Sequence, residues 1–355
     1  KCELIIFITM ANNESLKNLL PEEFNSWVQS RGYPAWRGQQ LCQWIYKNAV
    51  DNPDLMHNLP KSLRDDVKKF GNLTVLHTLA KPEKLLQYTQ KFLFRLHDGL
   101  AIESVFIPMK KRKTVCVSSQ VGCAMNCTFC QTAKMGYKRN LSPAEIIDQV
   151  YLISRFTDSS ISNVVFMGMG EPFLNFDNVI KAAKILNHPQ GYNIGARHIT
   201  VSTCGLVPEI LQFAELPYQF KLAISLNGAD DTVRSAIMPV NRQYPLSELI
   251  KAVKFYTDKT HRRVTFEYVL IKDVNMSEKD AENLTVLLSD LDCKVNLIPY
   301  NETQSHYLRP EDGEVEKFFK RVNKGLFSVT IRKSEGRRED AACGQLYIHE
   351  FTTKY

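Results

Sequence analysis

The sequence lacks three features that would assign it to other protein classes. No apolar run approaches the roughly 20 residues of a membrane-spanning helix, so we expect no membrane partner. It has no internal repeat and no low-complexity segment. Its 9 cysteines in 355 residues are an odd number, and they are too sparse for the disulfide framework of a small secreted protein. These absences favour a cytoplasmic protein with reduced thiols.

The composition predicts a folded protein of about two domains. Hydrophobic residues make up 44% and charged residues 23%, which excludes global disorder. Subtracting 38 Asp and Glu from 45 Lys and Arg gives a net charge of +7, which tolerates a nucleic-acid partner without establishing one. The start, KCELIIFITM, has a short apolar run without a small-residue cleavage site. We therefore favour a disordered part or an extension for residues 1–14, with Met10 as a candidate start. We favour this interpretation over an export signal.

Residues 15–72 predict a small helical accessory domain. In LCQWIYKN the apolar side chains recur at helical spacing, and SLRDDVKKF predicts a second helix with Ser62 as its N-cap. The domain carries exposed Arg and Lys. It is either a packing cap for the main domain or a contact module for RNA, and charge alone does not decide between them.

After a β-hairpin region over residues 73–108, strands and helices alternate regularly. Six strand–helix units follow one another, and several strands are near-continuous apolar runs, as in a parallel sheet buried on both faces. Ser142, Pro143 and Glu145 predict a capping box at the start of one helix. The pattern predicts an α/β sheet or partial barrel, with its chemistry on the loops that follow the strands.

The strongest chemical signal is Cys123-Ala-Met-Asn-Cys127-Thr-Phe-Cys130, directly after the first of these strands. Three thiolates satisfy three irons of a [4Fe–4S] cube and leave the fourth open to a ligand. The same spacing also describes a buried helical stripe, although Gly122 and Asn126 are poor helix formers. Zinc is the other metal interpretation, but no nearby His or second CxxC completes four ligands.

These motifs resemble the radical S-adenosylmethionine (SAM) enzymes, and in particular the dual-specificity methyltransferases of adenine C2 in 23S ribosomal RNA and tRNA. The segments that carry the resemblance are VCVSSQVGCAMNCTFC, FMGMGEPFLNFDNV, ITVSTCGLVP, MPVNRQYPL, VNLIPYN and DAACGQL. It implies an α/β fold, a partial (βα)6 radical SAM barrel with a small N-terminal helical accessory domain. The barrel would span residues 109–338, and residues 339–355 would form a C-terminal segment that carries a methyl-carrier cysteine.

The resemblance implies two cofactors: a [4Fe–4S] cluster and SAM, of which two molecules are used per turnover. Cys123, Cys127 and Cys130 would hold the cluster. The implied SAM contacts are Gly170, Glu171, Ser202, Ser225, Leu226, Asn227 and Asn301, with Gly168 in the same GMGEP turn. Taken alone, GMGE is an ordinary strand–turn and a single Ser is more often a turn residue or helix cap. These assignments therefore rest on the joint pattern.

Three further residues acquire catalytic roles from the resemblance. Cys343 would take a methyl group from one SAM, and a radical derived from the second SAM would activate that group for addition to adenine C2. Cys116 would help to release the RNA through a transient disulfide bond with Cys343. Glu103 would be the proton acceptor. Without the resemblance, these residues would be interpreted as a buried small residue, a core strand residue and an exposed hairpin carboxylate.

The implied partners are 23S rRNA, at the peptidyl-transferase centre, and tRNA, at position 37 next to the anticodon. An electron donor such as flavodoxin or ferredoxin is also implied, and we expect a monomer. The run from Lys110 to Lys113 is a phosphate-contact candidate, or else a solvated face. The remaining cysteines are interpreted as packing residues: Cys2, Cys42, Cys204 and Cys293.

Two departures from the family pattern and three alternatives remain open. Asn227 stands where the family commonly has His, and the stretch of Gly336, Arg337, Arg338, Glu339 and Asp340 is more basic than the family's. The alternatives are an adenine-C8 rRNA methyltransferase of the antibiotic-resistance type, a radical SAM enzyme that does not act on RNA, and a zinc-bearing RNA-binding protein.

Overall fold

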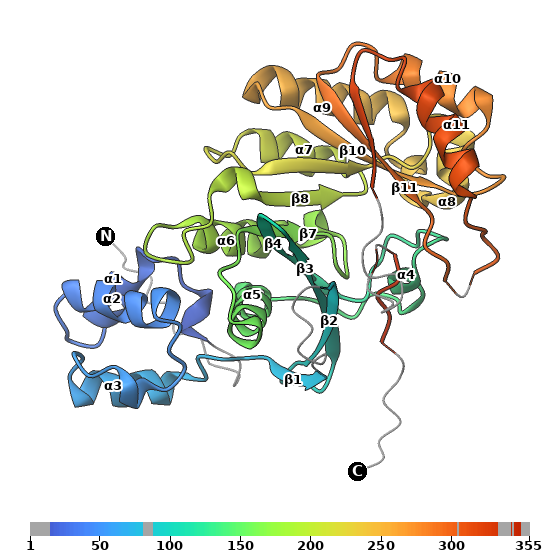
Figure 1. The fold of residues 1–355 in the computed structure, drawn as a ribbon. Coiled ribbons are helices and arrows are strands. Elements are labelled where there is room, and N and C mark those ends of the chain that lie inside the picture. The colour runs from blue at the N-terminus through green and yellow to red at the C-terminus, as the bar shows by residue number, and fades with distance from the viewer. Residues whose placement is uncertain (1–14, 81–87, 304, 333–341, 343, 349–355) are drawn as a thin grey trace.

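One long mixed sheet organises the molecule (Figure 1). The computed structural model describes residues 15–80, 88–303, 305–332, 342 and 344–348. Ten strands pair in the order β1-β2-β3-β4-β7-β8-β9-β10-β11-β12. Their bounds are β1 His77–Ala80, β2 Gln90–Arg95, β3 Ala101–Met109, β4 Arg112–Val117, β7 Asn163–Phe166, β8 Ile199–Thr203, β9 Lys221–Ser225, β10 Val264–Leu270, β11 Cys293–Pro299 and β12 Ser328–Ile331, and the short pair β5 Gln120–Val121 and β6 Arg139–Asn140 lies apart.

The predicted alternation of strands and helices is confirmed. Strands β4, β7, β8, β9, β10 and β11 are mutually parallel, as crossover helices require. A further parallel strand, β12, pairs with β11 and was not predicted. The helices of this part are α4 Gln131–Lys134, α5 Pro143–Thr157, α6 Phe176–Asn187, α7 Val207–Ala214, α8 Asp231–Ile237, α9 Leu246–Thr260, α10 Glu278–Leu287 and α11 Asp312–Val322.

The hairpin region is continuous with the barrel sheet instead of forming a separate layer. Strand β3 is nine residues long and pairs with β2 on one side and with β4 on the other, both antiparallel. The predicted turn is present: Gly99 has φ 81° between β2 and β3, a conformation that favours glycine. Two antiparallel strands therefore extend the parallel sheet beyond β4, with β1 at the edge.

Local sequence signals explain where the helices begin. Ser142 accepts a hydrogen bond from the Glu145 amide while the Glu145 carboxylate accepts one from the Ser142 amide, so the predicted capping box of α5 is confirmed. The predicted N-cap Ser62 is wrong. Helix α3, Lys61–Phe70, begins one residue earlier with Pro60 at its N-cap, since the fixed φ of proline suits the entry to a helix.

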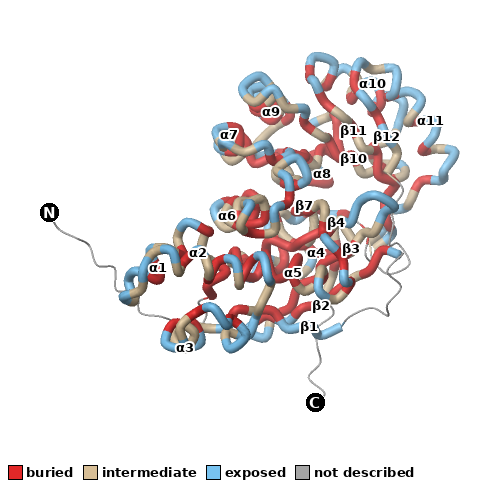
Figure 2. The backbone as a smooth tube through the Cα atoms, turned by 60° about the vertical axis from the view of Figure 1, so that its left-hand side comes forward, coloured by how far each residue is buried: buried red, intermediate tan, exposed pale blue. Residues whose placement is uncertain are grey.

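The N-terminal helices form a group of their own beside α5 (Figure 2). They are α1 Glu23–Gln29, α2 Trp36–Cys42 and α3, and a π-helical turn over Gln43–Lys47 continues α2. A buried ion pair joins this group to the barrel: Nζ of Lys17 lies 2.5 Å from Oδ1 of Asp148 on α5. The other oxygen of Asp148 accepts from the amides of Val75 and Leu76.

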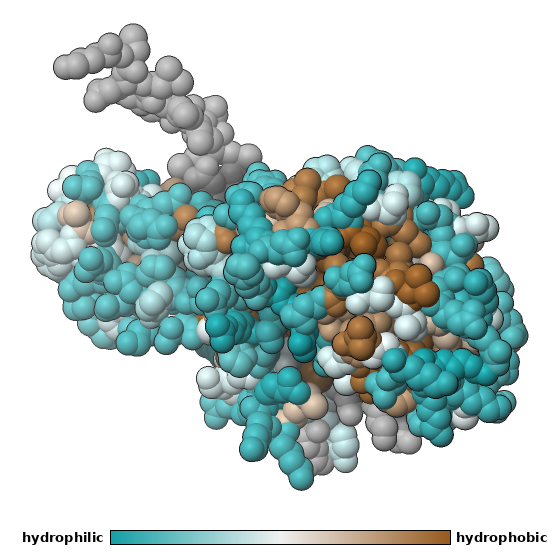
Figure 3. Space-filling view, turned by 90° about the horizontal axis from the view of Figure 1, so that it is seen from above, coloured by the Kyte–Doolittle hydropathy of each residue, from teal (hydrophilic) through white to brown (hydrophobic). Residues whose placement is uncertain are grey.

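The outer surface is mostly polar, with one patch of hydrophobic side chains visible from above (Figure 3). Leu211 of α7 and Phe255 of α9 are among the exposed apolar side chains, at 37% and 41% exposure. None of the helices in the described part of the chain combines the length and hydropathy that crossing a bilayer requires.

Candidate functional site

The carboxyl ends of the parallel strands surround one pocket. It is lined by residues after β5, by residues at or just after the ends of β7, β8, β9 and β11, and by Glu267 and Val269 within β10, much as expected for chemistry placed at strand ends. Most of the predicted cluster and cofactor residues line it. They are Cys123, Cys127, Cys130, Gly168, Gly170, Glu171, Ser202, Ser225, Asn227 and Asn301.

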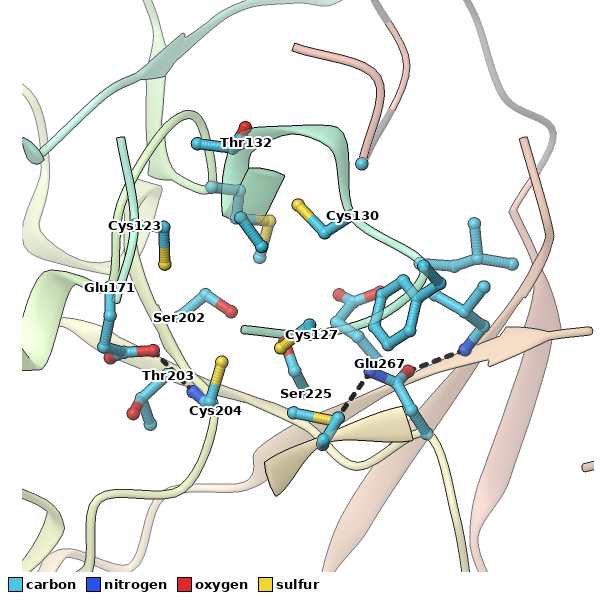
Figure 4. A pocket seen from close by; sticks show the side chains of 18 of the residues that line it. Cys123, Cys127, Cys130, Thr132, Glu171, Ser202, Thr203, Cys204, Ser225 and Glu267 are labelled. Atoms are coloured by element: carbon cyan, nitrogen blue, oxygen red, sulfur yellow. Dashed lines mark hydrogen bonds between the residues drawn. The ribbon is translucent and has the colours of Figure 1, made fainter. Parts of the chain in front are cut away.

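The three motif cysteines lie on a non-helical loop between β5 and α4 (Figure 4). This excludes the alternative of a buried helical stripe. Gly122 fixes the start of the loop at φ 72°, where an added Cβ would lie 1.7 Å from the carbonyl oxygen of Gly136. Burial raises the pKa of the Cys123 and Cys130 thiols, so their thiolates depend on a bound metal.

The arrangement fits an iron–sulfur cluster better than a single zinc ion. Among the described residues, no group of three or more His, Cys, Asp or Glu side chains converges tightly enough for one ion. A single zinc needs all its ligand atoms about 2.0–2.3 Å from one point. The three thiolates of a cluster bind separate irons, so they need only face one cavity. Cys123, Cys127 and Cys130 do so.

Glu171 is fixed at the edge of the pocket after β7. Its carboxylate is 2% exposed and accepts from the amides of Phe173, at 3.0 Å, and Cys204, at 2.8 Å. Burial raises its pKa, and these amide hydrogen bonds oppose that shift. The side chains of Thr203 and Cys204 also hydrogen-bond to this carboxylate and likewise oppose the pKa shift. Gly170 has φ 97°, and a Cβ added there would lie 2.5 Å from the side chain of Gln120. Only glycine therefore fits at this position.

The predicted SAM contacts on later strands divide into two groups. Ser202 and Ser225 line the pocket at the ends of β8 and β9. Asn227 also lines it, but its Oδ1 accepts from the Val269 amide and its φ is 56°, so it shapes the loop after β9. Leu226 is fully buried and is not among the lining residues. Any ligand contact of Leu226 stays a prediction.

Cys343 lies outside the described residues, but its two chain neighbours are described. Gly344 lines the pocket, and its carbonyl accepts from the amide of Gln131, the residue after Cys130. Thr132 donates to the carbonyl of Leu346. Ala342 is 5% exposed. The segment just after position 343 therefore packs against the start of α4, which directly follows the cysteine loop.

Glu103 and Cys116 lie together on neighbouring strands, outside the pocket lining. Val105 of β3 pairs with Cys116 of β4, and the hydroxyl of Ser118 donates to the Glu103 carbonyl. Glu103 is 4% exposed, so the interpretation as an exposed carboxylate is wrong. Its carboxylate accepts from Nζ of Lys91, at 2.9 Å, and from the amide of Tyr347, at 3.0 Å.

Sequence reasoning missed three residues of this pocket: Cys204, Glu267 and Arg332. Cys204 was interpreted as a packing residue, but it lines the pocket and its thiol interacts with Cys127. Burial and this contact raise its pKa well above the usual value. Glu267 had a visible signal, because it is a lone carboxylate in the apolar strand RVTFEYVLI.

The basic run does not adjoin the pocket. Lys110 and Lys111 form the exposed turn between β3 and β4, before β4 begins. The cysteine loop follows the opposite end of β4, so a six-residue strand separates the two. The run is therefore exposed and lies away from the pocket, and its role as a phosphate contact stays a prediction.

Two protein-family descriptions match this chain. "Radical SAM superfamily" matches residues 117–284, and "Ribosomal RNA large subunit methyltransferase N-terminal domain" matches residues 14–72. Two relatives described as probable dual-specificity RNA methyltransferase RlmN are similar over nearly the whole chain. The protein of Staphylococcus carnosus is 42% identical over 97% of this chain and 95% of its own length. That of Geobacillus kaustophilus is 43% identical over 95% and 93%.

A solved structure shares the fold. The crystal structure of a radical SAM methyltransferase from Sphaerobacter thermophilus superposes with a TM-score of 0.90 and 42% identity. The match covers 94% of this chain and 99% of that one. The shared fold thus extends over nearly the whole of both chains.

Proposed function

Because the chain belongs to the radical SAM family of dual-specificity RNA methyltransferases, we propose that it methylates C2 of adenosine in 23S rRNA and tRNA. The predicted targets are the peptidyl-transferase centre and tRNA position 37. One observation supports the proposal: Gly344 and Leu346, just after Cys343, accept hydrogen bonds from Gln131 and Thr132, just after Cys130. A methyl-carrying thiol and a cluster must share one cavity for this chemistry.

The family uses a [4Fe–4S] cluster and SAM, which together supply one-electron chemistry when bound. Cys123, Cys127 and Cys130 are the proposed cluster ligands. Glu171 is proposed to pair with the ammonium group of SAM, since it lines the same pocket as the three cysteines. The glycines of the GMGEP turn let a ligand approach the backbone closely.

Three residues are proposed to act on the methyl group and the RNA. The Cys343 thiolate displaces the methyl group from the SAM sulfonium: an S–C bond forms, the sulfonium S–C bond breaks, and S-adenosylhomocysteine leaves. Cys116 releases the RNA later: its thiolate forms an S–S bond with the Cys343 sulfur, the S–C bond from Cys343 to the RNA-linked carbon breaks, and that carbon keeps the electron pair and takes up a proton to become the methyl group. Glu103 is the proposed proton acceptor. Its carboxylate is held by Nζ of Lys91 and by the amide of Tyr347.

We propose that the helices of residues 15–72 contact RNA. Trp36 is 51% exposed, and the guanidinium of Arg37 lies 3.9 Å from its ring centroid. An exposed aromatic ring with a stacked cation suits bases and phosphates. Lys61 and Lys69 of α3 are also exposed. The electron donor is proposed to be a flavodoxin or ferredoxin, acting on a monomer in the cytoplasm.

The test is methylation by the reconstituted protein under anaerobic conditions, with a low-potential reductant, SAM and either RNA. We expect 2-methyladenosine on mass spectrometry of the digested RNA. Formation of 8-methyladenosine alone would instead support the C8 alternative. Cys343→Ala should abolish product. Cys293→Ala is the matched control, because Cys293 is buried at the start of β11, away from the pocket. A cluster-loaded protein that modifies neither RNA would overturn the proposal.

A further inference from the structure

One buried carboxylate in the pocket has no role in the proposed function. Glu267 lies on β10 and is 7% exposed, and it is one of the lining residues. Figure 4 shows it across the pocket from Glu171. Its Oε1 accepts a hydrogen bond from Nδ2 of Asn296, at 2.9 Å. Its Oε2 is fully buried and has no hydrogen-bond partner among the described residues.

The neighbouring strands hold this carboxylate in one orientation. Glu267 pairs in register with Ser225 of β9 and with Asn296 of β11. Asn296 in turn accepts from the hydroxyl of Thr330 on β12, at 2.7 Å, which fixes which way its amide faces. A polar row thus crosses four strands at the level of the pocket. It holds one oxygen of Glu267 and leaves the other facing the cavity.

An unpaired buried carboxylate oxygen is unfavourable for folding alone. A buried acceptor without a partner lowers the stability of the fold by more than a typical hydrogen bond raises it. The loss is larger still when the acceptor is charged. Glutamine would satisfy Asn296 equally well and would carry no charge. A ligand that donates a hydrogen bond to Oε2 of Glu267 would explain this unpaired acceptor.

We infer that Oε2 of Glu267 accepts a hydrogen bond from a ribose hydroxyl of bound SAM. This inference rests on the proposed function. The order of strands supports it: Glu171 follows β7, and Asn301 follows β11. The amino-acid part of SAM is expected at the cysteine loop and Glu171, and its adenine towards Asn301. The ribose joins these two parts, and Glu267 lies between them on β10.

The chemistry of the two groups matches. A carboxylate only accepts hydrogen bonds, and a ribose offers two adjacent O–H donors. An acidic side chain takes a ribose hydroxyl in the same way at dinucleotide sites. Ser202 and Ser225 also line this part of the pocket and can both donate and accept. Glu267 therefore adds the one acceptor-only group on this side of the cavity.

The test is SAM binding to the cluster-loaded protein, measured by equilibrium dialysis. Glu267→Gln should weaken binding at least tenfold, and Glu267→Met, which has neither donor nor acceptor, at least as much. The 2′-deoxy or the 3′-deoxy analogue of SAM should bind the unsubstituted protein at least tenfold more weakly than SAM. In Glu267→Met, whose side chain offers the ribose hydroxyl no partner, the same analogue should bind less than threefold more weakly than SAM.

Glu209→Gln is the matched control. Glu209 lies on α7, outside the pocket lining, and its Oε2 also lacks a partner among the described residues. The affinity of the Glu209→Gln variant for SAM should stay within twofold of that of the unsubstituted protein. Iron content and thermal midpoints show whether each variant keeps its cluster and fold. If the Glu267 variants bind SAM as tightly as the unsubstituted, RNA-methylating protein does, this inference alone fails. If the unsubstituted protein binds no SAM, the inference and the proposed function fail together.

Discussion

The buried pair of Lys17 and Asp148 should decide whether the N-terminal helices stay attached to the barrel. Both side chains are at most 2% exposed, and Asp148 also accepts from two amides. Asp148→Asn leaves the Lys17 ammonium buried without a counter-charge. Removing one partner of a buried ion pair costs about 3–5 kcal/mol. We expect a loss of this size in the free energy of unfolding, or several degrees in the thermal midpoint.

A double-mutant cycle separates charge from packing. Lys17→Met alone leaves a buried carboxylate with two amide donors, and it should cost a similar amount. Lys17→Met combined with Asp148→Asn leaves no net charge and should recover most of the loss, to within about 1–2 kcal/mol of the unsubstituted protein. Urea unfolding followed by circular dichroism measures all four proteins. Losses that simply add in the double variant would refute the reasoning, since uncoupled side chains cannot form a buried pair.

Three further outcomes follow from the site. Gly122→Ala should lower the free energy of unfolding by at least about 2–3 kcal/mol, because its φ is 72° and an added Cβ would meet the Gly136 carbonyl. Gly136→Ala, with open space around it, should lower the free energy of unfolding by about 1 kcal/mol, and urea unfolding measures both variants. Cys127→Ala should leave iron well below about four atoms per chain after reconstitution, and iron retained at that level would exclude Cys127 as a ligand. Burial raises the pKa of Glu267 above its usual 4.5, opposed by Arg332 and Lys294. The folded protein without SAM should therefore lose stability relative to Glu267→Gln as pH rises above 4.5; a constant difference between pH 4 and pH 8 would contradict this.

The sequence could predict those parts of the fold that depend on local patterns. Apolar runs and capping residues such as Ser142 and Glu145 identified the parallel strands and α5, because burial on both faces and helix capping leave local signatures. Strand β12 was missed because SVTI has only four residues, too few for a clear alternating pattern. The continuity of the hairpin region with the barrel depends on pairing between β3 and β4, which no local pattern encodes.

The candidate site shows the same difference between residues predicted from local patterns and residues placed by contacts remote in sequence. The spacing of Cys123, Cys127 and Cys130 carried its own chemical meaning and could be interpreted directly. The role of Cys204 could not be predicted, since a single thiol has no spacing and acquires its position from the loop after β8. The burial of Glu103 likewise follows from Lys91 on β2 and Tyr347 near the chain end, two partners remote in sequence.

The hydrogen bonds from Gln131 and Thr132 to Gly344 and Leu346 join two parts of the chain that are remote in sequence. The residues just after position 343 therefore take their place from α4 as well as from their own neighbours in sequence. A substitution in α4 that removes either contact would release this segment without changing a single cysteine.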